Sequence, residues 1–150
     1  MWLDALLAYL HFTAIFLLFA FLTVEVVLIR QPLDMRNLRL LGRMDIWYFA
    51  SAIGALVTGF ARAAFGAKGG DFYFGAWPIY VKIGLFLLVA GISIKPTMTF
   101  IRWRRTLEAE PGWQVPAAEQ AAMRRLVFIE VHLAALIPVF AVIMSRGLGH

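Results

Sequence analysis

Long apolar runs, separated by short polar stretches, dominate the chain. Four such runs cover residues 3–29, 46–65, 77–94 and 126–144. Because about 20 mostly apolar residues are enough for a helix to cross a bilayer, each run predicts one membrane span. Backbone polar groups in lipid must bond within their own segment, so these spans must be helices. The sequence therefore predicts an all-α integral membrane four-helix bundle that forms a single domain.

The composition agrees with this pattern. Of 150 residues, 62% are hydrophobic and 15% are charged, whereas a soluble domain has about half apolar and about a quarter charged residues. An ordinary soluble enzyme and a disordered tail are thereby excluded. With no cysteine, disulfides, thiolate metal sites and a thiol nucleophile are excluded as well. The first run lacks a basic leader and a small-residue cleavage site, which predicts a retained span and not a signal peptide.

Positive charges gather in two of the three connections between the runs. The first and third connections and their edges hold Arg30, Arg36, Arg39, Arg43, Lys95, Arg102, Arg104, Arg105, Arg124 and Arg125. The opposite side holds only Arg62, Lys68, Lys82 and Arg146. The positive-inside rule then places both termini outside and the two basic connections in the cytoplasm, as expected for a multi-pass protein of the bacterial inner membrane. The net charge of +5 is thus a topology signal, with anionic lipid headgroups as expected partners and no nucleic acid.

Local signals refine the boundaries of these elements. Gln31-Pro32 predicts the end of the first helix, and Lys95-Pro96 predicts a kink or stop near the end of the third. The stretch from Pro116 to Glu119 predicts the start of the fourth helix. The glycine-rich and aromatic segment 65–75 predicts a tight re-entry at the membrane interface.

Ionisable residues inside the runs need an explanation, because each costs a few kcal/mol in a bilayer and usually faces a partner. They are His11, Glu25, Arg62, Lys82, Glu130 and His132. At about 1.5 Å per helical residue, His11, Arg62 and Lys82 fall together on the outer half of the membrane. Glu25 and Glu130 fall on the inner half, where Asp45, Arg43 and the loop arginines are within reach. The sequence thus predicts an outer histidine–cation cluster (His11, Arg62 and Lys82) and an inner carboxylate–arginine cluster.

Structural interpretations of the same residues stay open at this point. Lys82 and Arg62 can extend to the interface as anchors, and the glutamates can pair with arginines at the membrane edge. A histidine in a span can be a structural hydrogen-bonding group. Glu130 and His132 are two positions apart, about 200° around the helix, so both cannot point inward. One of them must face a neighbouring helix, a headgroup or a partner subunit.

The histidine–cation cluster contains the groups that a haem requires. A neutral imidazole in an apolar four-helix bundle is a common axial ligand of b-type haem, which makes His11 the candidate iron ligand. Arg62 and Lys82 supply positive charge for the two propionates. His132 is the candidate second ligand, although it lies about 6 Å deeper than His11 along the membrane. This interpretation predicts a haem b-binding redox protein that exchanges electrons with quinone or a partner protein.

Over nearly its whole length the chain resembles a family of small four-span bacterial membrane proteins of unknown function. The matching stretches are Leu6–His11, Glu25, Arg43–Asp45, Gly59–Arg62, Phe65–Gly69, Lys82, Pro96-Thr97 and Arg102–Arg104. This resemblance implies a four-span membrane protein and supplies no activity.

More remotely, the chain resembles the HemJ-type protoporphyrinogen oxidases and the CopD-like membrane proteins. The shared features are an early histidine (His11), a tryptophan and a lysine in the third span (Trp77 and Lys82), and Arg125, Glu130 and Arg146 around the fourth. The chain departs from the HemJ pattern at Ile79-Tyr80, where that family has a histidine, and at Arg146, where it has a lysine. The resemblance implies a haem b-containing oxidase of late haem biosynthesis, with the early histidine as haem ligand.

A non-redox function is the alternative: a membrane accessory or small-molecule transport subunit with a structural charge cluster. Its charged residues would bind a small anion or stabilise an assembly. Ala52, Gly54, Ala55 and Gly59 form a small-residue face on the second helix, which favours close helix approach and a homo-oligomer. Whether the protein is an enzyme, and on what substrate, stays open at this level.

Overall fold

The computed structural model describes residues 2–66 and 70–147. Its elements are α1 (Trp2–Leu28), α2 (Met35–Phe65), the short α3 (Gly70–Phe74), α4 (Trp77–Ala109) and α5 (Ala117–Ser145). The four long helices are each long and apolar enough to cross a membrane. The prediction of an all-α four-helix membrane fold is confirmed.

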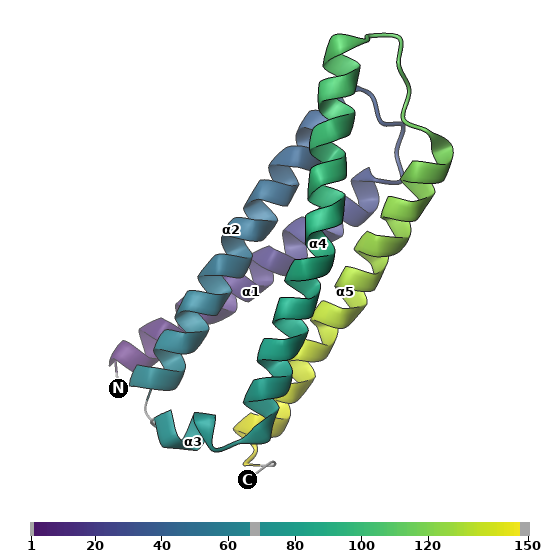
Figure 1. Ribbon diagram of the computed structural model, residues 1–150. Coiled ribbons are helices and arrows are strands. Elements are labelled where there is room, and N and C mark those ends of the chain that lie inside the picture. Colours follow the sequence, from purple (N-terminus) through teal and green to yellow (C-terminus); the bar gives the residue numbers. More distant parts are fainter. Residues whose placement is uncertain (1, 67–69, 148–150) are drawn as a thin grey trace.

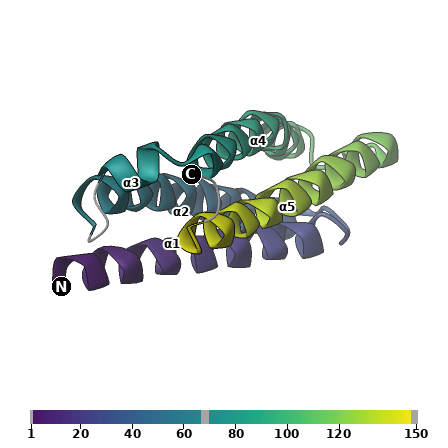
Figure 2. The ribbon, with the colours of Figure 1, turned by 90° about the horizontal axis from the view of Figure 1, so that it is seen from below.

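The four long helices form two antiparallel hairpins (Figure 1). In one hairpin α1 packs along α2, and in the other α4 packs along α5. Figure 2 shows α4 beside α2 and α5 beside α1, so the hairpins join into one bundle. Both termini and α3 lie at one end, here called the terminal end, and the two basic connections lie at the other, the loop end. Placing the terminal end outside the cell stays a prediction from the charges.

Three helices continue past the apolar runs at the loop end. α2 begins at Met35, α4 runs to Ala109, and α5 begins at Ala117. Asp34 caps α2, because its side chain accepts a hydrogen bond of 2.7 Å from the backbone nitrogen of Asn37. Such a cap satisfies one of the free amides of the first turn. The predicted helix start after Pro116 is confirmed.

Pro96 does not stop α4, which continues as one helix from Trp77 to Ala109. The predicted stop at this position is therefore wrong. A proline ring removes one backbone hydrogen bond to the preceding turn, but Pro96 is fully buried. Packing on the neighbouring helices holds the helix together across the missing bond, as is usual in membrane proteins.

The apolar core lies mainly toward the loop end. Its buried members come from all four long helices or their ends: Leu22, Leu28, Ile29, Leu38, Leu41, Tyr48, Phe100, Trp103, Met123 and Val127. Polar contacts close the same end, since the side-chain amide of Gln120 donates to the carbonyls of Ile29 at 2.9 Å and Gln31 at 3.1 Å. A smaller cluster of Ala76, Ile79 and Met144 lies at the terminal end. The two hairpins are therefore held together most firmly at the loop end.

The outer surface of the bundle is apolar. Each long helix exposes large hydrophobic side chains, for example Phe16 (73% exposed), Val57 (60%), Leu87 (62%) and Val142 (58%). Soluble monomers rarely expose contiguous apolar surface of this extent. The surface is suited to contact with lipid chains.

Candidate functional site

His11 of α1 is held by a threonine of α2. Its Nδ1 atom lies 3.1 Å from Oγ1 of Thr58, and that hydroxyl donates to the carbonyl of Gly54 at 2.6 Å. A hydroxyl has one proton, and this one is used on the carbonyl. The ring also hydrogen-bonds to the backbone of Ala55. The tautomer protonated at Nδ1 is compatible with the Thr58 contact, and in that tautomer Nε2 carries the lone pair that a metal ion would use.

Small residues on α2 make this close contact between α1 and α2 possible. A Cβ atom at Gly54 would lie 3.6 Å from the side chain of Ala14, in ordinary contact. A Cβ atom at Gly59 would lie 3.0 Å from Cε1 of His11, so a side chain there would displace the ring. The small-residue face that the sequence offered to a partner subunit therefore contacts α1 of the same chain.

Two cations lie near the His11 ring. Arg62 and Lys82 both interact with it electrostatically. The guanidinium carbon of Arg62 lies 5.4 Å from the ring centroid of Phe12, in cation–π contact. The Nε atom of Arg62 is buried and has no hydrogen-bond partner among the residues that the structure describes. The structure thus brings His11, Arg62 and Lys82 together near the terminal end.

His132 lies away from this cluster. It is exposed on α5, its Nδ1 bonds to the carbonyl of Phe128 at 2.7 Å, and its ring stacks on that of Phe128 at 4.1 Å between centroids. Glu130, two positions earlier, is only 2% exposed. The glutamate therefore faces the interior and the histidine faces outward. The structure does not bring His132 and His11 together.

The donor set at the histidine–cation cluster fits a haem with one protein ligand. Nε2 of His11 is the iron-binding type of atom. Arg62 and Lys82 are the charge type that propionates need, and the unpartnered Nε of Arg62 offers a donor. The exposed His132 supplies no second ligand to this site. The two described cavities lie at the loop end and are lined by other residues.

Three buried carboxyl groups lie in the interior of the bundle. Glu25 of α1 is 2% exposed, Asp45 of α2 is 5% exposed, and Glu130 of α5 is 2% exposed. Each pair among the three interacts electrostatically. These three residues are called the carboxyl cluster below.

Hydroxyl groups from α2 and α4 surround the carboxyl cluster. Oγ of Ser93 bonds to Oε1 of Glu130, and the hydroxyl of Tyr48 lies 3.0 Å from the same Oγ. Oγ1 of Thr97 donates to Oδ1 of Asp45 at 3.0 Å. Oε1 of Glu25, in contrast, is buried without a hydrogen-bond partner in the described part of the chain. All four long helices therefore contribute a polar group to this site.

Among the described residues, no arginine forms an ion pair with any of these three carboxyl groups. The predicted carboxylate–arginine cluster is therefore wrong. The ion pairs among residues 2–66 and 70–147 join Arg102 to Glu119 at 2.5 Å and Arg104 to Glu108 at 3.8 Å. Arg43 is exposed, while Asp45 is buried. The two lie about 200° apart around α2, so an arginine at the right depth points to the wrong side.

The sequence interpretation missed three hydroxyl residues: Tyr48, Ser93 and Thr97. A signal for them was present in the spacing. Tyr48 follows Asp45 by three positions, and Thr97 follows Ser93 by four, so each pair shares a helix face. A polar stripe on an otherwise apolar helix is a sign of a polar interior.

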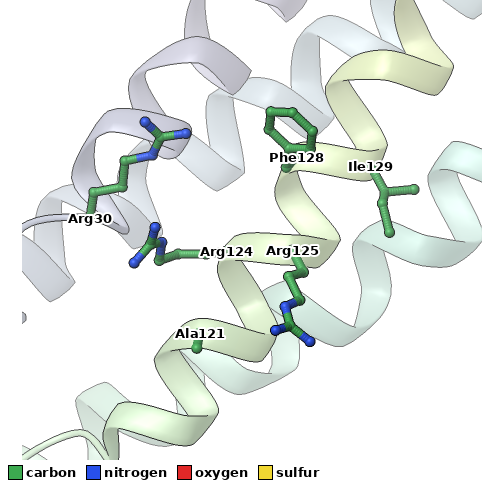
Figure 3. A pocket seen from close by; sticks show the side chains of 6 residues that line it. All are labelled: Arg30, Ala121, Arg124, Arg125, Phe128 and Ile129. Carbon is green, nitrogen blue, oxygen red and sulfur yellow. The ribbon is translucent and has the colours of Figure 1, made fainter.

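A basic cavity lies at the loop end (Figure 3). It measures about 530 Å³ and is lined by Arg30, Ala121, Arg124, Arg125, Phe128 and Ile129. Figure 3 shows the side chain of Arg124 extending from α5 toward Arg30, with Phe128 one turn further along the helix. The cavity thus combines guanidinium groups with an apolar wall.

The chain belongs to the family described as "Predicted membrane protein (DUF2214)", whose model matches residues 3–149. No match is found among curated proteins or among solved structures. Together with the four spans, this membership makes the protein a multi-pass membrane protein. It confirms the resemblance to an uncharacterised family of small membrane proteins.

Proposed function

We propose that this protein is a haem b-binding protein of the bacterial inner membrane, with an electron-transfer or HemJ-like oxidoreductase function. The proposal rests on one observation above all: Nδ1 of His11 lies 3.1 Å from the Thr58 hydroxyl, and the ring interacts electrostatically with two cations, Arg62 and Lys82. The remote resemblance to HemJ-type oxidases, through His11 and Lys82, points to the same chemistry. Quinone or a redox partner protein would exchange electrons with the site.

Each residue of the histidine–cation cluster has a defined task in this proposal. His11 would bind the iron through Nε2. Thr58 would fix the orientation and the tautomer of the ring by accepting a hydrogen bond from its Nδ1–H group. Arg62 and Lys82 would bond the propionates, which would give the buried Nε of Arg62 the partner it lacks. The bound haem supplies one-electron chemistry.

The visible absorption spectrum tests this proposal. Protein purified from haem-replete cells is expected to show a Soret band that shifts on reduction. Absence of the band, together with no haem uptake by the purified protein, would overturn the proposal. Rescue of a strain that lacks its own protoporphyrinogen oxidase would favour the HemJ-like reaction over simple electron transfer.

The second candidate function is a non-redox accessory or transport subunit whose cations bind a small anion. Among the described residues, neither Arg62 nor Lys82 is in an ion pair, and the Nε of Arg62 is unpartnered. A guanidinium favours a charged, planar acceptor. This candidate is distinguished by anion binding to haem-free protein that is lost in Arg62→Gln, without any Soret band in the wild type.

We also expect the basic cavity to bind the headgroup of an anionic phospholipid. Arg30 and Arg124 would contact the phosphate, and the apolar wall at Phe128 would contact an acyl chain. Replacing Arg30 and Arg124 together by glutamine is expected to weaken retention of anionic lipid about tenfold or more, since charge-assisted hydrogen bonds contribute about 1.5–3 kcal/mol. Native mass spectrometry with mixed anionic and zwitterionic lipids measures this.

Arg36→Gln is the matched control for the lipid measurement. Arg36 is exposed at the same end of the bundle but does not line the cavity. The prediction is wrong when the control loses as much anionic lipid as the double variant, because the attraction then comes from the overall charge of the loops.

A further inference from the structure

The carboxyl cluster lies deep in the bundle and is closed off from the loop end. Asp45 is about 15 Å along α2 from its first residue, and Glu130 is about 20 Å along α5. On the loop side of the cluster, every long helix places apolar core residues across the path: Leu28 of α1, Leu38 and Leu41 of α2, Phe100 and Trp103 of α4, and Met123 and Val127 of α5. Water from that end is therefore excluded by a packed apolar layer.

No cation compensates the three carboxyl groups among the described residues. The groups facing the cluster are Glu25 from α1, Asp45 and Tyr48 from α2, Ser93 and Thr97 from α4, and Glu130 from α5. The basic residues next in sequence are exposed: Arg30, Arg43, Lys95 and Arg125. Three uncompensated carboxylates in a low-dielectric interior would cost several kcal/mol each. The cluster must therefore hold protons or a bound cation.

The arrangement favours protons over a metal ion. Among the described residues, no three or more histidine, aspartate or glutamate side chains are grouped as a metal ion would require. The cluster instead pairs carboxyl groups with hydroxyl groups, which exchange the donor and acceptor roles by rotating one bond.

Ser93 can serve both protonation states of Glu130. Its Oγ lies against Glu130 and also 2.8 Å from the carbonyl of Val89. When Glu130 is ionised, Ser93 donates to it. When Glu130 is protonated, the acid donates to Oγ, and the serine proton turns to the carbonyl, which can only accept. Tyr48 can donate to the remaining lone pair of Oγ in both states.

Thr97 repeats this design at Asp45. Its Oγ1 lies 3.0 Å from Oδ1 of Asp45 and 3.0 Å from the carbonyl of Ser93. The hydroxyl can therefore donate to an ionised aspartate, or accept from a protonated one and donate to the carbonyl. Asp45 and Glu130, on different helices, thus each have a hydroxyl partner that can either donate to the carboxyl group or accept from it.

Glu25 differs, because nothing within the described residues stabilises its charge. Its Oε1 is buried without a hydrogen-bond partner, and it interacts electrostatically with both Asp45 and Glu130. Burying a polar oxygen unsatisfied costs about 1–3 kcal/mol, and more when it is charged. A shielded, unpaired oxygen that interacts electrostatically with two other acids is stabilised when its carboxyl group binds a proton.

We propose that Glu25, Asp45 and Glu130 form an intramembrane proton-binding site, in which Ser93 and Thr97 rotate as the carboxyl groups take up and release protons. The proposal does not depend on haem. It assigns to the middle of the bundle a proton-handling role, separate from the histidine–cation cluster near the terminal end.

Infrared spectroscopy of the protein in lipid nanodiscs tests this assignment. At neutral pH the wild type is expected to show the C=O stretch of protonated carboxyl groups, shifted in heavy water. Glu25→Gln and Glu130→Gln are each expected to remove part of that band. The control Glu108→Gln, at an exposed and ion-paired glutamate, should leave the band unchanged. Circular dichroism verifies that each variant is folded.

Two further measurements make the outcome decisive. Raising the pH is expected to remove the protonated band reversibly while the helices stay intact, as an exchangeable site requires. Ser93→Ala is expected to shift the Glu130 component in frequency without removing it, so the assignment can be tested even when Glu25→Gln does not fold. Absence of the band in the wild type, or a band that does not change in Glu130→Gln and Ser93→Ala, would overturn the proposal.

Discussion

We expect the wild-type protein to show a Soret band and His11→Ala to lack it. His11 is the one histidine among the described residues whose ring is hydrogen-bonded to a side chain of another helix, through Thr58. Without an imidazole at this position the cluster offers no iron-binding nitrogen, and only Arg62 and Lys82 would hold the haem. The measurement is the absorption spectrum and the haem content of the purified variant.

His132→Ala is the matched control for this prediction. His132 is exposed on α5 and bonds to the carbonyl of Phe128 at 2.7 Å. Its replacement is expected to leave the Soret band and the haem content unchanged. Retention of the band in His11→Ala, or its loss in His132→Ala, would show that the iron ligand has been wrongly assigned.

Thr58 offers a graded version of the same test. Thr58→Val keeps the shape of the side chain but removes the acceptor for the Nδ1 proton of His11. Outer-shell partners of metal-binding histidines are typically worth 10–100-fold in affinity, so haem binding is expected to weaken by about that factor. Thr58→Ser, which keeps the hydroxyl, should bind nearly as the wild type does. Equal affinities in the two variants would contradict the anchoring role.

The fold was predictable because lipid leaves few choices. Four runs of apolar residues with no water-facing pattern lead to four helices. The helix lengths were not predictable from the same signal. In α2, the segment before residue 46 contains several arginines and was interpreted as a connection, yet Leu38 and Leu41, three positions apart, are both fully buried. A helix can continue past the end of an apolar run as an amphipathic segment, and a prediction from hydropathy alone then makes the helix too short.

The depth of each candidate residue along its helix was predictable from the sequence, but the side of the helix that faces the interior was not. Counting residues placed His11, Arg62 and Lys82 at one level, and the structure brings them together. The direction in which a side chain points depends on how its helix packs against the other helices, and the sequence alone does not give that packing. Arg43 lies at nearly the depth of Asp45 but points outward, where its long side chain can reach headgroups and water.

Glu130 and His132 of α5 also differ in the direction that they face. Glu130 and His132 are two positions apart and face opposite ways, which their spacing required, but only the packing of α5 on α4 selects the glutamate as the buried one. The hydrogen bond from Ser93 identifies that choice. The same packing keeps His132 away from the histidine–cation cluster and places Glu130 in the carboxyl cluster.

Trp103→Ala is expected to lower the free energy of unfolding by about 3–5 kcal/mol, the usual cost of truncating a fully buried aromatic residue. Trp103 of α4 is 0% exposed in the loop-end core, with the ring of Phe100 at 5.9 Å between centroids. Its Nε1 donates to Oε2 of Glu119 at 2.9 Å, and the same oxygen pairs with Arg102 at 2.5 Å. The substitution therefore opens a cavity and removes a hydrogen bond between α4 and α5. Denaturant titration in detergent micelles, followed by circular dichroism, measures the loss.

Two substitutions separate the contributions to this loss. Trp103→Phe keeps most of the buried ring but removes the donor to Glu119, so about 1 kcal/mol of the loss is expected. Trp2→Ala removes a tryptophan that is 89% exposed and should change stability by less than about 0.5 kcal/mol. Equal losses in Trp103→Ala and Trp2→Ala would contradict a packed loop end. Because the hairpins meet most closely there, Trp103→Ala should also admit water to the carboxyl cluster, and faster deuterium exchange at that site than in the wild type is the expected sign.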